Sequence, residues 1–167
     1  MIITEDFKRE YGCVFVSYEY SGMKTLHDMI DKEDIYKPGE YGLENDPHVT
    51  LLFGLPDEIS KEDIETKLQG FDFSNCTIRN ASLFKQKDFE VLKFEAYSND
   101  FQSAHKKLDE IPNEDQWSKY DPHMTIAYLK PGRGDEYVQL LKGYSDYIES
   151  KGVYYSLING KNLLLNV

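Results

Sequence analysis

Two short stretches decide the fold of this chain: DPHVTL (residues 46–51) and DPHMTI (residues 121–126). Both read Asp-Pro-His-x-Thr followed by an aliphatic residue, and the second begins 75 residues after the first. A repeat of this kind indicates two copies of one structural unit. We therefore predict a single domain, residues 1–167, built from two similar lobes that cover approximately residues 1–88 and 89–167.

The elements around the two motifs repeat in the same order. Apolar and aromatic runs with β-branched residues predict strands, and apolar residues three or four apart predict helices. Besides the motif strands, the expected strands are residues 13–20, 75–84, 89–97, 153–158 and 161–166, and the expected helices are 23–30, 60–68, 101–111 and 136–141. This order predicts an α+β fold of two lobes related by a pseudo-twofold axis, each with a mainly antiparallel sheet and outer helices. The active site would lie in a central cleft between the lobes.

Composition and charge exclude several functional classes. The 167 residues are 40% hydrophobic and 14% aromatic, which is enough for one packed core. A net charge of −11, from 30 acidic and 19 basic residues, argues against a duplex nucleic acid partner, because phosphate affinity comes mostly from Lys and Arg. No apolar run is long enough to cross a bilayer, and Cys13 and Cys76 lack a CxxC pattern. We expect a cytoplasmic protein with reduced cysteines and no membrane partner.

The motifs place a histidine and a threonine on the same face of each strand. Alternate residues of a strand point the same way, so His48 pairs with Thr50 and His123 with Thr125. Two residues span roughly 6.5–7 Å along a strand, and both side chains can reach one tetrahedral anion. A neutral histidine can accept a proton and a protonated one can donate it, while the hydroxyls bond developing charge on phosphate oxygens. These four residues are the predicted catalytic set for phosphodiester cleavage.

Two other interpretations of the histidines compete with this chemistry. A zinc site is weakly supported, because only Asp46 and Asp121 offer further ligands near the motifs. We therefore predict no metal and no cofactor. A single His-x-Thr would favour an ordinary strand histidine, but two matching copies with the same preceding Asp-Pro favour catalysis.

The motifs HVTL (48–51) and HMTI (123–126) resemble those of the two-histidine (2H) phosphoesterase superfamily. The hallmark of that superfamily is a pair of His-hydrophobic-Thr/Ser-hydrophobic motifs, one in each lobe. The resemblance covers nearly the whole chain in element order. It implies a bilobal fold and metal-independent hydrolysis of phosphodiesters by the two histidines, with the two threonines holding the phosphate.

The stretch GLENDPHVTLLFGL (42–55) and the short acidic chain resemble the phage anti-CBASS nucleases. That resemblance implies cleavage of 3′,5′ linkages in cyclic di- and trinucleotide immune signals such as cyclic GMP–AMP, in an infected bacterial host. The substrate's own 2′-hydroxyl would attack the phosphorus. The alternatives are an RNA 2′,3′-cyclic phosphodiesterase of the LigT type, which the charge disfavours, and a non-hydrolysing cyclic nucleotide sponge. The sequence leaves open the base, ring size, linkage isomer, oligomeric state and assignment of acid and base.

Aromatic residues near strand ends are candidates for stacking on a substrate base. We predict this role for Tyr18 and Phe84, and by the repeat for Tyr155, because base–aromatic stacking contributes roughly 1–3 kcal/mol for any base. Packing within the core is the alternative for each of them.

Three further features of the sequence are a long loop, two helix histidines and a basic segment. The loop at residues 31–45 leads into the first motif and is predicted to gate the substrate. His27 and His105 fall on expected helices and receive no function. The densest basic segment is interpreted mainly as a solvated hairpin, with a few lysines as candidates for a second phosphate or a base edge; it contains Arg79, Lys85, Lys87 and Lys93.

Overall fold

The computed structural model describes residues 10–167, which form one antiparallel sheet of seven strands with four α-helices and a short 3-10 helix. The strands are β1 (Gly12–Glu19), β2 (His48–Leu55), β3 (Asn75–Lys85), β4 (Glu90–Tyr97), β5 (His123–Leu129), β6 (Ser145–Ser156) and β7 (Asn162–Leu164). The helices are α1 (Gly22–Asp28), α2 (Lys61–Leu68), α3 (Phe101–Leu108) and α4 (Gly134–Leu140), with η1 (Lys32–Asp34) after α1. The predicted α+β class is confirmed.

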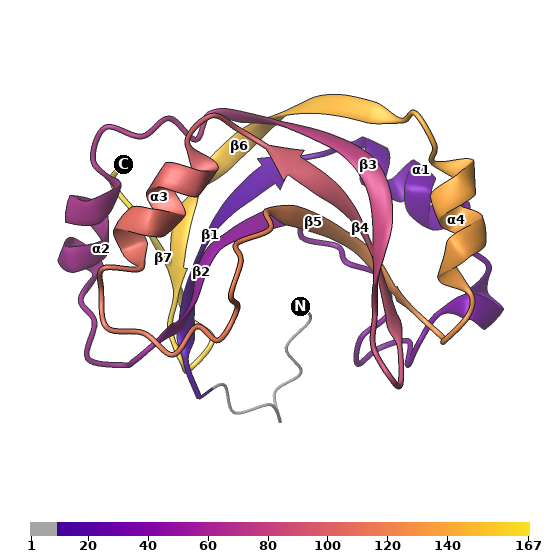
Figure 1. Ribbon diagram of the computed structural model, residues 1–167, viewed down its shortest axis with the longest axis horizontal. Helices are drawn as coiled ribbons and strands as arrows, with labels where there is room; N and C mark the ends of the chain where they lie inside the picture. The colour runs from indigo at the N-terminus through magenta and orange to yellow at the C-terminus, as the bar shows by residue number, and fades with distance from the viewer. Residues whose placement is uncertain (1–9) are drawn as a thin grey trace.

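The sheet curves into an arch with the helices outside it (Figure 1). Its strand order is β2-β1-β6-β3-β4-β5, and β7 pairs with β6. The two edge strands, β2 and β5, approach each other with Cα atoms within 8 Å. Because these are the strands that carry the motifs, the curvature of the sheet brings the two motifs together.

The lobes of the structure do not coincide with the two halves of the sequence. One lobe contains β1, β2, β7, the second half of β6, and helices α2 and α3 (Figure 1). The other contains β3, β4, β5, and helices α1 and α4. The predicted lobe boundaries at 1–88 and 89–167 are therefore wrong, because α1 exchanges places with α3 and β3 with β6. Each lobe is completed by segments from both repeats.

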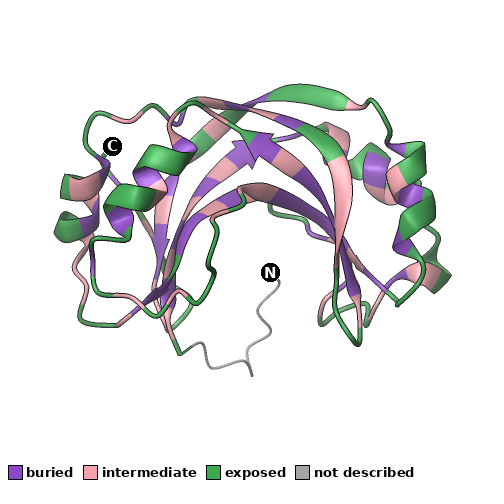
Figure 2. Ribbon diagram, viewed as in Figure 1, coloured by how far each residue is buried: buried purple, intermediate pink, exposed green. Residues whose placement is uncertain are grey.

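Local sequence patterns explain the buried faces of these elements. In β1, Val14, Val16 and Tyr18 are fully buried while the residues between them are half-buried, as expected for a strand covered mainly on one face. The helices turn buried positions towards the sheet and exposed positions outward (Figure 2). Helix α2 begins after Ser60, whose Oγ accepts a hydrogen bond from the backbone N–H of Asp63 at 3.1 Å. Ser60 thus satisfies one of the free backbone N–H groups of the first helical turn.

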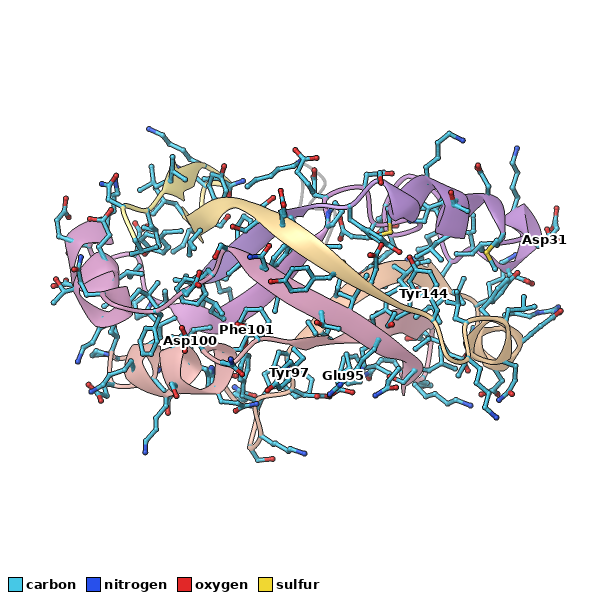
Figure 3. The ribbon with its side chains drawn as sticks, turned by 90° about the horizontal axis from the view of Figure 1, so that it is seen from above. Asp31, Glu95, Tyr97, Asp100, Phe101 and Tyr144 are labelled. Carbon is cyan, nitrogen blue, oxygen red and sulfur yellow. The ribbon has the colours of Figure 1, made fainter. Side chains whose placement is uncertain are left out.

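Strand β6 begins at Ser145, eight residues before the predicted start at residue 153. In a view from above, this first part of β6 runs beside β3 over the top of the molecule (Figure 3). Its side chains are mostly exposed, with Ile148 as the buried exception, so it carries no alternating apolar pattern. Residues 145–148 pair with β3 alone, and β1 joins on the other side from Glu149 onward. Pairing with neighbouring strands, rather than an apolar pattern, makes this segment a strand.

The segment at residues 31–45 lies along the free edge of β5. Tyr36 N donates to Tyr128 O at 2.9 Å, Tyr128 N donates to Gly42 O at 2.7 Å, and Glu44 N donates to Ile126 O at 3.0 Å. These bonds satisfy an otherwise open sheet edge. The segment is therefore an edge cover rather than the lid predicted from its length.

Two general expectations can be compared with the described residues. Cys13 is half-buried and Cys76 buried, and both are thiols rather than partners in a disulfide. Among the helices of residues 10–167, none combines the length and apolar composition that a membrane span requires.

Candidate active site

The four predicted catalytic residues lie on the concave side of the sheet. His48 and His123 are the first residues of β2 and β5, and both are half-buried. The positions that alternate with them, Val49 and Met124, are fully buried on the helix-covered side. His48 and Thr50 therefore face the concave side, and so do their counterparts on β5.

Each motif strand contains an irregularity directly after its threonine. Phe15 pairs with Thr50 and Val14 pairs with Leu52, so Leu51 is left out of the ladder with β1. On β5 the equivalent shift leaves out Ile126. Such bulges bend a strand and redirect its side chains, and they are frequent beside active sites.

Helix histidines hold the carbonyl groups of both bulged residues. His105 of α3 hydrogen-bonds Leu51 O through Nδ1 at 2.7 Å, and His27 of α1 hydrogen-bonds Ile126 O through Nε2 at 2.9 Å. His105 also stacks on the ring of Tyr120 at 4.1 Å between centroids. The two histidines without an assigned role from sequence thus fix the strands that carry the motifs.

Both motif histidines are oriented by the carbonyl group two residues before them. His48 Nδ1 lies 2.7 Å from Asp46 O, and His123 Nδ1 lies 2.8 Å from Asp121 O. A carbonyl oxygen can only accept, so Nδ1 carries the proton in the neutral ring and Nε2 carries the lone pair. Each Nε2 is therefore suited to exchange a proton with a bound substrate.

Burial lowers the pKa of both motif histidines below the ordinary value, because it penalises the charged ring. For His123 the positive charge of Lys93 lowers the pKa further, while the carbonyl and carboxylate of Asp121 oppose the shift. For His48 the carboxylate of Glu44 acts in the opposite direction to burial. His48 also contributes electrostatically to the shift of His123, as expected for two rings that share one site.

Residues 23–149 match the family model described as the 2′-5′ RNA ligase superfamily. The chain belongs to this family. The family consists of 2H phosphoesterases, so the protein is an enzyme that acts on phosphodiester bonds. No curated protein matches the sequence significantly.

Solved structures share the fold of this 2H phosphoesterase. Usb1 from Kluyveromyces marxianus matches with a TM-score of 0.61 and 8% identity, covering 96% of this chain and 99% of that one. The same Usb1 with uridine monophosphate gives a TM-score of 0.59 and 7% identity over 96% and 99%. The MHV ns2 PDE domain gives 0.51 and 13% identity over 95% and 100%. At these identities the likeness establishes a common fold.

The three predicted base-stacking residues have different positions in the structure. Phe84 is half-buried and packs edge-on against His123, with ring centroids 5.0 Å apart. Tyr18 and Tyr155 are 0% and 1% exposed. They belong to the core under the helices, where Tyr155 donates a hydrogen bond to Ile59 O. The predictions for Tyr18 and Tyr155 are wrong, because both rings lie on the face of the sheet opposite the motifs.

Sequence reasoning missed Phe15 and Tyr154 on the concave face, and it did not single out Lys93 from the other basic residues of its segment. Phe15 packs edge-on against His48 at 5.5 Å and stacks on Tyr154 at 5.6 Å. Lys93, interpreted mainly as part of a solvated hairpin, is instead 5% exposed and pairs across the strands with Thr125. The alternation along β1 already separates Phe15 from the buried face of the strand, which includes Tyr18. The position of Lys93 depends on strand pairing that the sequence does not reveal.

The part of the chain that the structure describes contains no cluster of three or more His, Cys, Asp or Glu side chains arranged to hold a metal ion. The prediction that the enzyme needs no metal remains a prediction for the assay below.

Proposed function

We propose that this 2H phosphoesterase cleaves 3′,5′ linkages in cyclic di- and trinucleotides without a metal, and so opposes CBASS defence in bacteria infected by phage. The observation that carries the proposal is the equivalent orientation of His48 and His123 on the two strands that meet. The resemblance of residues 42–55 to phage anti-CBASS nucleases supports this substrate class. The net charge of −11 disfavours large nucleic acid substrates.

The proposed reaction begins with attack by the substrate's 2′-hydroxyl on the adjacent phosphorus. One neutral histidine accepts the hydroxyl proton through Nε2 while the P–O2′ bond forms. The other histidine, protonated, donates its Nε2 proton to the 5′ oxygen as the P–O5′ bond breaks. Thr50 and Thr125 donate hydrogen bonds to the non-bridging oxygens, where negative charge increases. The product is a linear nucleotide with a 5′-hydroxyl and a 2′,3′-cyclic phosphate, which water can open with the two histidine roles reversed.

The direct test uses EDTA-treated protein with 3′,3′-cyclic GMP–AMP and with a cyclic trinucleotide. Products are separated by chromatography and identified by mass spectrometry. We expect linear products at a rate that the chelator does not change. Loss of cleavage on chelation, with recovery on adding a divalent ion, would refute the metal-independent mechanism.

Variants of the two histidines connect the activity to the site. We expect His48→Ala and His123→Ala each to abolish turnover, because general acid and base catalysis each contribute typically 10²–10⁴-fold. Both side chains lie on the concave face rather than in the core, so the melting temperature should change little. A large loss of folding in both variants would show that the histidines are structural.

The name of the family, the 2′-5′ RNA ligase superfamily, refers to RNA and favours one alternative activity. An RNA 2′,3′-cyclic phosphodiesterase would leave cyclic dinucleotides intact and open the cyclic phosphate at RNA ends. Incubation with an RNA oligonucleotide bearing a 2′,3′-cyclic phosphate separates the two activities. Recovery of intact cyclic nucleotide after denaturing a saturated complex would instead identify a sponge.

A further inference from the structure

The row of side chains that crosses the sheet at Thr125 is cationic and polar. Thr125 on β5 pairs with Lys93 on β4, and Lys93 pairs with Ser82 on β3. Residues paired across antiparallel strands point to the same face, so all three side chains lie on the concave side with the motifs. Lys93 Nζ donates a hydrogen bond to Ser82 Oγ at 3.1 Å, which confirms this direction.

The equivalent row in the other lobe is aromatic. Thr50 on β2 pairs with Phe15 on β1, and Phe15 pairs with Tyr154 on β6. The two rings stack with an interplanar angle of 19°. Where one lobe presents an ammonium group beside its threonine, the other lobe thus presents a flat apolar surface.

Lys93 is unusually placed for a side chain with only a structural role. Its side chain is 7% exposed, and within residues 10–167 its ion pair is with Asp121, whose carboxylate oxygen is 3.7 Å from Nζ. That distance exceeds a hydrogen bond, and the Asp121 side chain is 53% exposed. The close neighbours of Nζ are thus a neutral hydroxyl, on Ser82, and the ring of Phe84. Burying a cation is costly when no carboxylate lies within hydrogen-bond distance, and such groups are concentrated at functional sites.

The surroundings of Lys93 connect it to the catalytic set. Nζ lies 4.1 Å from the ring centroid of Phe84, and the same ring packs against His123. The positive charge of Lys93 also contributes to the lowered pKa of His123. An ammonium group has three protons for hydrogen bonds and commonly binds phosphate in proteins.

We propose that Lys93 binds a phosphate oxygen of the substrate on the His123 side of the site, while the stacked rings of Phe15 and Tyr154 receive a nucleobase on the His48 side. The proposal rests on the proposed phosphodiesterase function and deepens it. The two catalytic halves are then unequal, and the substrate binds in one orientation across the pseudo-twofold axis.

The test uses the full chain and two probes, inorganic phosphate and adenosine monophosphate. Binding is measured by calorimetry and by NMR shifts of the histidine side chains. Lys93→Met should weaken binding of both probes about tenfold or more, because a charge-assisted hydrogen bond is lost. Lys93→Arg should retain most of the affinity, and Lys106→Met, at an exposed position on α3, should leave it unchanged.

The aromatic side of the proposal predicts a different pattern. Phe15→Leu should weaken adenosine monophosphate binding about fivefold or more but leave inorganic phosphate binding unchanged. Equal losses for both probes would overturn the assignment of a base to this row. In Lys93→Met the NMR titration of His123 should move to higher pH, because a neighbouring positive charge has been removed.

Unchanged phosphate affinity in Lys93→Met, or no measurable phosphate binding by the unaltered protein, would overturn the phosphate site. Failure of the proposed function gives a distinct result. If no cyclic nucleotide is cleaved but Lys93→Met still loses phosphate binding, the result supports the phosphate site and refutes the proposed reaction. A melting temperature of Lys93→Met equal to or above that of the unaltered protein would show that the loss of binding does not come from unfolding.

Discussion

Replacement of His105 by alanine should destabilise the protein without directly removing a catalytic group. The ring hydrogen-bonds the carbonyl of Leu51, the bulged residue, at 2.7 Å. It also stacks on Tyr120 with centroids 4.1 Å apart and an interplanar angle of 6°. Both contacts disappear in His105→Ala.

The expected loss can be worked out from these contacts. A buried carbonyl left without its donor costs about 1–3 kcal/mol, and an aromatic stacking pair contributes about 0.5–1.5 kcal/mol. We therefore expect the free energy of unfolding to fall by roughly 2–4 kcal/mol. For a domain of this size, that corresponds to a decrease in melting temperature of about 5–15 °C.

The assay is urea unfolding followed by circular dichroism, with cleavage measured in parallel. His105→Gln keeps a side-chain donor and should recover part of the lost stability. Ser103→Ala, at an exposed position of the same helix, should change little. A His105→Ala free energy within about 0.5 kcal/mol of the unaltered protein would refute the role given to this histidine. Complete loss of activity at full stability would instead assign it to the chemistry.

Three further predictions concern the site and its support. Because burial lowers the pKa of His48 and His123, NMR titration should place the pKa of both rings below 6.5. The value of kcat/KM should then be highest below pH 6.5, where one ring is protonated and the other neutral. A maximum of kcat/KM above pH 7 would contradict this. Thr50→Val and Thr125→Val should each lower kcat about 10²-fold with little change in melting temperature; a change in KM alone would assign the hydroxyls to ground-state binding. Gly54→Ala should destabilise the fold, since φ is +90° and the new Cβ would lie 2.7 Å from the backbone of Glu114 and Asp115. A stability equal to that of the unaltered protein would show that this backbone moves aside at no cost.

Much of the secondary structure was predictable because it is encoded locally. The apolar alternation of β1 and the helical spacing of Phe101, Ala104 and Leu108 in α3 appear directly in the sequence. Strand β7 follows Asn159-Gly160, a strong hairpin signal. The first half of β6 was missed because most of its residues lie on the surface and only pairing with β3 and β1 makes them a strand.

The exchange of helices and strands between lobes was not predictable from the repeat. Two similar units can each bury an apolar face against their own helices or against those of the other unit, and both arrangements satisfy the same local pattern. The choice is made by contacts between distant residues, such as His105 with Leu51 and His27 with Ile126. Neither pair is recognisable from spacing in the chain.

The amino-acid sequence alone determined that two His-x-Thr strands exist and that each presents its polar pair on one face, because alternation is a property of every strand. Tertiary structure decided what stands beside those pairs. It placed Tyr18 in the core and Lys93 next to Thr125. The physical reason is that the neighbours of a side chain on a sheet come from adjacent strands, and strand order and register are set by packing of the whole chain.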